Sequence, residues 1–162
     1  MTLPGTTLLI GIGHDYRRDD SVGLLIAREL EKRALPGTAV VEATGGGMAL
    51  IEAWRGAERV LLVDAVSAGG QAGTVHRLDA QTQALPAGLF PYSTHGWGLA
   101  ETLALARLLG PWPPQFILYG IEGGDFGWGV GLTPAVAAAA RQVIERLTEE
   151  LAGERTGPFQ PD

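Results

Sequence analysis

Apolar strand-like runs and amphipathic helical patterns alternate between residues 7 and 66 of this 162-residue chain. The apolar runs cover 7–12, 38–42 and 59–66, and the helical patterns cover about 22–33 and 48–54. Strands and helices in this order need crossover connections, which place successive strands parallel in one sheet with helices packed on its faces. The chain is therefore predicted to be α/β, with a largely parallel twisted sheet and helices on both faces.

The remaining sequence continues this pattern. We expect a short strand at 73–78, at or near an edge of the sheet, then a helix at about 97–109, a strand at 115–121 and a final helix at 135–151. Thr133 and Pro134 are typical of an N-cap followed by a first-turn proline. We predict one domain over residues 1–152 and a flexible C-terminal tail over 153–162.

Composition excludes several classes of function. The formal net charge of −6, without a large basic cluster, argues against nucleic acid or an anionic membrane as a partner. The absence of cysteine excludes disulfides, zinc-thiolate sites and thiol nucleophiles. The N-terminus has no signal-peptide pattern, and the chain has no 18-residue apolar stretch. We therefore expect a cytoplasmic protein. We also expect a monomer.

The turn after the first strand carries the first candidate site residues. Gly11 and Gly13 suit a tight turn, but Tyr16 occupies the position of the third glycine of a dinucleotide-binding fingerprint, which excludes that motif. Asp19 and Asp20 follow at the start of a helix. Such acids either complement the helix dipole or bind a ligand, and the turn alone does not decide between these readings.

Asp64 ends the apolar run VLLVD, and His95 precedes the next predicted helix. In an open parallel sheet the carboxyl ends of the strands meet at one edge, where ligand-binding loops gather. Asp20, Asp64 and His95 are therefore predicted to converge on one rim. Two carboxylates and one imidazole would suit a divalent Ni, Mn, Zn or Fe ion without distinguishing among them. The alternatives to metal binding are that Asp64 caps the loop that follows it and that His95 is a histidine without a ligand role.

The order of these motifs over about residues 8–151 resembles the hydrogenase maturation endopeptidases. The matching segments are Gly11-Ile12-Gly13-His14, Asp19-Asp20, Gly23, Val63-Asp64-Ala65, Ser93-Thr94-His95, Tyr119-Gly120-Ile121-Glu122 and Leu132-Thr133-Pro134. The resemblance implies an enzyme that cleaves a C-terminal extension from the large-subunit precursor of a nickel-iron hydrogenase after nickel insertion. It also implies that Asp20, Asp64 and His95 contact nickel, which arrives with the precursor.

This sequence departs from the family pattern at three positions. His14 replaces a common Asn, Asp20 replaces a common Glu, and Ser21 replaces a common Gly. The glycine-rich loop at 45–47 and the loop at 125–129 are each either substrate contacts or ordinary loops.

No serine lies in a nucleophile elbow, so metal-assisted attack by water is the expected chemistry. Two alternatives stay open. One is a non-catalytic checkpoint or chaperone that binds the same precursor, and the other is a hydrolase with a resident divalent metal.

Overall fold

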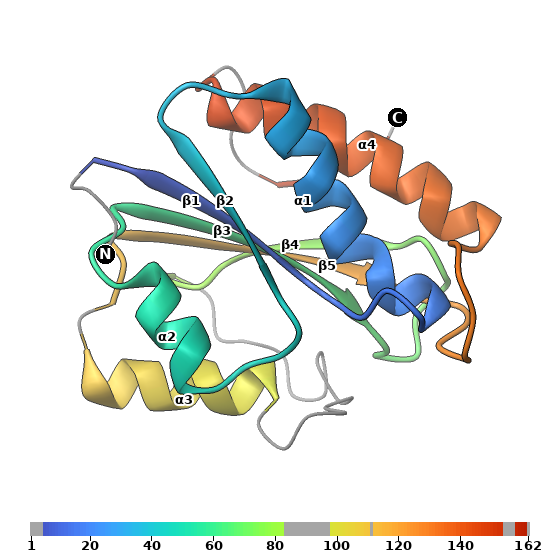
Figure 1. The fold of residues 1–162 in the computed structure, drawn as a ribbon, viewed down its shortest axis with the longest axis horizontal. Helices are drawn as coiled ribbons and strands as arrows, with labels where there is room; N and C mark the ends of the chain where they lie inside the picture. Colours follow the sequence, from blue (N-terminus) through green and yellow to red (C-terminus); the bar gives the residue numbers. More distant parts are fainter. Residues whose placement is uncertain (1–4, 83–97, 111, 154–157, 162) are drawn as a thin grey trace.

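The computed structural model describes residues 5–82, 98–110, 112–153 and 158–161. Its centre is a five-stranded sheet with the strand order β2-β1-β3-β5-β4 (Figure 1). The strands are β1 (Thr7–Ile12), β2 (Thr38–Ala43), β3 (Arg59–Val66), β4 (Val75–Asp79) and β5 (Gln115–Glu122). Four strands are parallel, and only β4, at the edge, runs antiparallel to its neighbour β5. The predicted largely parallel sheet is confirmed.

Two helices cover each face of this sheet. The helices are α1 (Val22–Arg33), α2 (Met48–Trp54), α3 (Leu99–Leu109) and α4 (Pro134–Leu151), and a 3₁₀ helix η1 (Arg18–Ser21) precedes α1. In Figure 1, α1 and α4 lie on one face, and α2 and α3 lie on the other. The strand and helix positions expected from the sequence are confirmed to within about two residues.

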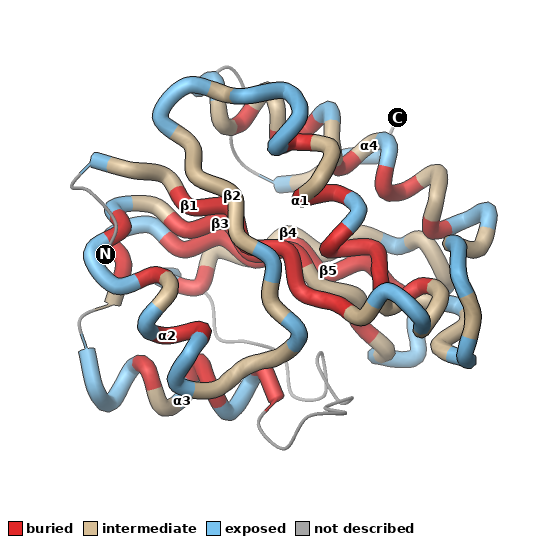
Figure 2. The backbone as a smooth tube through the Cα atoms, in the orientation of Figure 1, coloured by how far each residue is buried: buried red, intermediate tan, exposed pale blue. Residues whose placement is uncertain are grey.

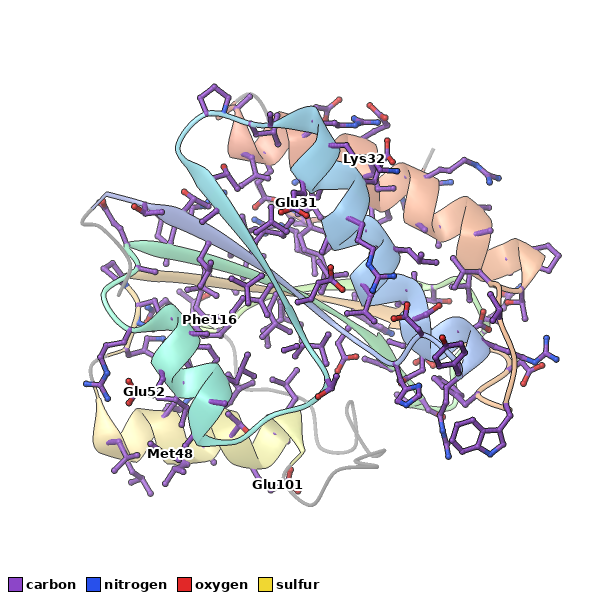
Figure 3. All side chains as sticks on the ribbon, viewed as in Figure 1. Glu31, Lys32, Met48, Glu52, Glu101 and Phe116 are labelled. Atoms are coloured by element: carbon purple, nitrogen blue, oxygen red, sulfur yellow. The ribbon has the colours of Figure 1, made fainter. Side chains whose placement is uncertain are left out.

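The sheet separates two hydrophobic cores, and the central strands are buried over most of their length (Figure 2). One core contains Trp54 and Phe116, and Figure 3 shows Phe116 between the sheet and α2. The other core lies under α1 and α4. None of the helices in the described ranges is long and apolar enough to cross a membrane.

Residues after α4 were expected to form a flexible tail, and that expectation, like the domain boundary, stays a prediction. Within this segment the ring of Phe159 lies edge-on to the ring of Tyr119, with 6.4 Å between centroids. Phe159 also packs against the core under α1 and α4.

A close contact between β1 and α1 fixes the turn that carries the candidate site. A Cβ atom on Gly23 would lie 2.2 Å from the carbonyl oxygen of Ile12 and 2.5 Å from that of Val63. A Cβ atom on Gly11 would lie 2.2 Å from the carbonyl oxygen of Gly23. Only glycine at both positions lets the helix approach the strands this closely.

We expect Gly23→Ala to lower the free energy of unfolding by about 2–3 kcal/mol, because the added methyl group meets backbone atoms that cannot move independently. Thermal unfolding measures this loss. Leu25→Ala on the same helix is the control. Leu25 is 39 % exposed, so its truncation should cost less than about 1 kcal/mol. Equal effects of the two substitutions would contradict this packing.

Candidate functional site

Asp20 lies in η1, between the end of β1 and the start of α1. Its backbone N–H donates to the carbonyl oxygen of Arg17 (3.0 Å), and its own carbonyl accepts from the N–H of His14 (3.4 Å). A Cβ atom on Gly13 would lie 2.2 Å from the Asp20 carbonyl oxygen. The glycine therefore allows the turn to fold back tightly, and this holds Asp20 over the carboxyl end of the sheet.

Asp64 lies in β3, opposite Gly120 of β5. Alternation along the strand places its side chain on the same face as Leu62, the face that α2 and α3 cover. Burial raises the pKa of Asp64 well above its usual value of 3.8, and the negative charge of Asp20 raises it further. A backbone hydrogen bond from Ala65 opposes this shift less strongly. The two carboxylates are thus close enough to resist joint ionisation.

Of the three predicted ligands, the structure brings Asp20 and Asp64 together, and His95 lies outside the described residues. Among residues 5–82, 98–110, 112–153 and 158–161, no group of three or more His, Cys, Asp or Glu side chains is arranged to hold a metal ion. A site made of Asp20, Asp64 and His95 therefore stays a prediction.

Asp19, which the sequence suggested as a helix-dipole residue or ligand, instead holds the loop after β5 in place. Its side chain is fully buried. One carboxylate oxygen accepts the N–H groups of Gly124 (2.8 Å) and Asp125 (2.9 Å), and the other accepts the N–H of Thr133 (2.8 Å). A single carboxylate thus fastens both ends of the loop 124–133 to the turn that carries Asp20.

Thr133 is the N-cap residue of α4 and Pro134 follows it as the first helical residue, so the predicted helix start is confirmed, although no side-chain hydrogen bond caps the helix. The Thr133 hydroxyl donates to Asp19 instead, at 2.9 Å. A buried charged acceptor makes a stronger hydrogen bond than a backbone group at an exposed helix end, which accounts for the change of partner.

Glu122 and His76 form a second polar pair at this edge. Glu122 is buried, with 1 % of the residue exposed. Its carboxylate accepts a hydrogen bond from the N–H of Ala68 at 3.2 Å. Its other oxygen lies 3.4 Å from Nε2 of His76. The His76 ring is partly buried and faces this carboxylate from the edge strand β4. Glu122 carried no sequence signal beyond its place in the family-like motif.

The glycine-rich loop at 45–47 borders a cavity of about 470 Å³ between α1 and α2. Arg28 lies at this cavity and forms ion pairs with Asp15 and Glu42, both at 2.7 Å. The N–H of Gly47 donates to the hydroxyl of Thr102, which ties the loop to α3. The loop is therefore anchored beside an open cavity, and substrate contact there stays a prediction.

Comparison with known proteins gives consistent matches. The family model described as hydrogenase maturation protease matches residues 24–150. The hydrogenase expression/formation protein HupD of Thiocapsa roseopersicina is 31 % identical over 150 residues, covering 90 % of this chain and 67 % of that protein. The hydrogenase 2 maturation protease of Escherichia coli strain K12 is 30 % identical, covering 89 % of each chain. The solution structure of an endopeptidase from Escherichia coli matches with a TM-score of 0.78 at 28 % identity, covering 94 % of this chain and 97 % of that one.

Proposed function

Since the chain belongs to the hydrogenase maturation protease family, we propose that it is the endopeptidase that removes the C-terminal extension of a nickel-iron hydrogenase large-subunit precursor. The precursor carries the nickel as part of the substrate. Asp20, Asp64 and His95 are proposed to contact that nickel. A monomeric state and a cytoplasmic location stay predictions.

The carboxylate pair of Asp20 and Asp64 is the observation that supports this proposal. Two like charges that oppose each other's ionisation are a poor arrangement for stability and a good one for binding a cation, because a divalent ion neutralises both. Carboxylate oxygens are suitable ligands for a divalent nickel ion when combined with an imidazole. A site of this kind is best completed by an ion that arrives with the substrate.

The chemistry proposed is hydrolysis by water. Water adds to the scissile carbonyl carbon, the C–N bond breaks, and the leaving amine takes a proton. The nickel of the precursor would polarise the carbonyl or lower the pKa of the water, and a carboxylate would accept the water's proton. The raised pKa makes Asp64 a stronger base than an ordinary aspartate in the free protein.

The test is incubation of the purified protein with the nickel-loaded precursor, followed by mass spectrometry of both products. We expect a shortened large subunit and one released C-terminal peptide, and no cleavage of the nickel-free precursor. Stable binding without cleavage would favour the non-catalytic checkpoint. Cleavage of the nickel-free precursor only after another divalent metal is added would favour a hydrolase with a resident metal.

A further inference from the structure

Two loops present an exposed aromatic and cationic surface beside the carboxylate pair. We call it the aromatic rim, and it consists of His14, Tyr16 and Arg17 from the loop after β1 with Trp128 and Val130 from the loop after β5. Tyr16 is 62 % exposed, Trp128 is 70 % exposed and Val130 is 75 % exposed. Large apolar side chains gathered on one surface indicate an interaction site more often than isolated ones do.

The backbone holds the two loops of the rim against each other. The N–H of Gly129 donates to the carbonyl of Tyr16 (2.9 Å), and the N–H of Arg18 donates to the carbonyl of Gly129 (3.1 Å). Gly129 has φ +148°, and a Cβ atom there would lie 2.8 Å from the guanidinium carbon of Arg18. Trp128 is therefore exposed without being on a free loop, so its ring is positioned before a partner arrives.

Arg17 adds a positive charge to this surface. Its guanidinium carbon lies 4.4 Å from the centre of the Trp128 ring. No carboxylate of the described residues lies within 4.0 Å of it, whereas Arg18 pairs with Asp125 at 3.5 Å. A cation that rests on an indole ring, in a chain of net charge −6, can recognise a carboxylate on a partner.

We infer that the aromatic rim binds a segment of the precursor in which an apolar side chain lies next to a carboxylate. This inference rests on the proposed function. The loop of the rim after β1 is joined to the turn that carries Asp20, because the backbone carbonyl of Arg17 accepts the Asp20 N–H and the N–H of His14 donates to the Asp20 carbonyl. Since Arg17 contacts Trp128 with its side chain and Asp20 with its backbone, we expect a polypeptide whose metal centre reaches Asp20 to extend to Trp128. The indole contacts the apolar group, and Arg17 contacts the carboxylate.

The test measures binding and cleavage of the nickel-loaded precursor by Trp128→Ala, Trp128→Phe and Arg17→Ala. We expect Trp128→Ala to raise KM by about 10- to 100-fold with kcat changed by less than about threefold, since exposed aromatic anchors contribute binding energy. Trp128→Phe should recover most of the loss. Arg17→Ala should weaken precursor binding at low salt, and the affinity of this variant should depend less on salt concentration than that of the wild type.

Leu108→Ala is the matched control. Leu108 is also an exposed apolar residue, at 85 %, but it lies at the end of α3, just before β5 begins and outside the aromatic rim. This substitution should leave KM unchanged. A KM for Trp128→Ala within about twofold of wild type, with the thermal midpoint unchanged, would overturn the inference. Failure of the wild type to cleave any precursor would instead refute the proposed function. In that case direct binding of the precursor to wild type and Trp128→Ala still tests the rim.

Discussion

Asp64→Asn should make the protein more stable and inactive. The carboxylate is partly buried beside Asp20, and both features raise its pKa well above 3.8. Each unit by which the folded-state pKa exceeds the unfolded value corresponds to about 1.4 kcal/mol of lost stability at a pH above both values. The neutral amide removes this penalty. Precursor cleavage should fall by at least about 100-fold, because the amide neither binds a cation strongly nor accepts a proton.

The pH dependence of this gain has a defined sign. Because the folded-state pKa is raised, the folded state holds the proton more tightly, so no penalty exists below the unfolded pKa near 3.8. The penalty grows as the pH rises from there to the folded-state pKa, and it stays constant above it. Thermal unfolding of wild type and Asp64→Asn from about pH 4 to about pH 8 should therefore show a widening difference.

Asp15→Asn is the control for this series. A hydrogen bond from Arg28 lowers the pKa of Asp15, so removing its charge should slightly destabilise the protein at neutral pH. The two substitutions thus have opposite signs at neutral pH. A lower thermal midpoint for Asp64→Asn at that pH would contradict the strained carboxylate pair, and unimpaired cleavage would remove Asp64 from the proposed site.

Asp19→Ala should cause the largest loss of stability, about 3–5 kcal/mol. The substitution leaves the N–H groups of Gly124, Asp125 and Thr133 without their acceptor, and hydrogen bonds to a buried charge are the strong ones. Asp19→Asn should lower the stability by a similar amount, because the NH₂ group of the new amide would face N–H donors in place of one acceptor oxygen. In a chain of this size the thermal midpoint should fall by about 10 °C or more.

Thr133→Val is the matched control for Asp19, because it removes only the hydroxyl donor and keeps the backbone N–H. It should cost about 1 kcal/mol. Activity should be lost in Asp19→Ala even below its melting temperature, since the loop that carries Trp128 and the turn that carries Asp20 are no longer joined. An active Asp19→Ala of wild-type stability would contradict this role.

Much of the fold was readable from the sequence because each strand and helix has its own hydrophobic period. The strand at Arg59–Val66 and the helix at Met48–Trp54 have the predicted bounds. The edge position of β4 was predicted, whereas its antiparallel direction is seen only in the structure. These features depend on residues that are neighbours in sequence, where periodicity and turn chemistry act directly.

The side-chain partners were less predictable, because they join residues far apart in the chain. Asp19 and Thr133 are 114 positions apart, and each was predicted from its neighbours to have a local role at a helix start. Glu150 had no signal, although it is fully buried in α4 and accepts the hydroxyl of Tyr119 at 2.5 Å. Its burial is offset by Arg59 and Arg77, which also bind it. Such pairings appear only once tertiary packing brings the strands and helices together.

The rate of precursor cleavage by Asp20→Asn and Asp20→Glu tests most directly whether the carboxylate pair is the functional site. Glutamate keeps the charge and restores the longer acid common in the family, so it should retain at least about a tenth of the wild-type rate. Asparagine should lose about 100-fold. Near-wild-type cleavage by Asp20→Asn would contradict the account, because Asp20 would then be only a residue at a helix start.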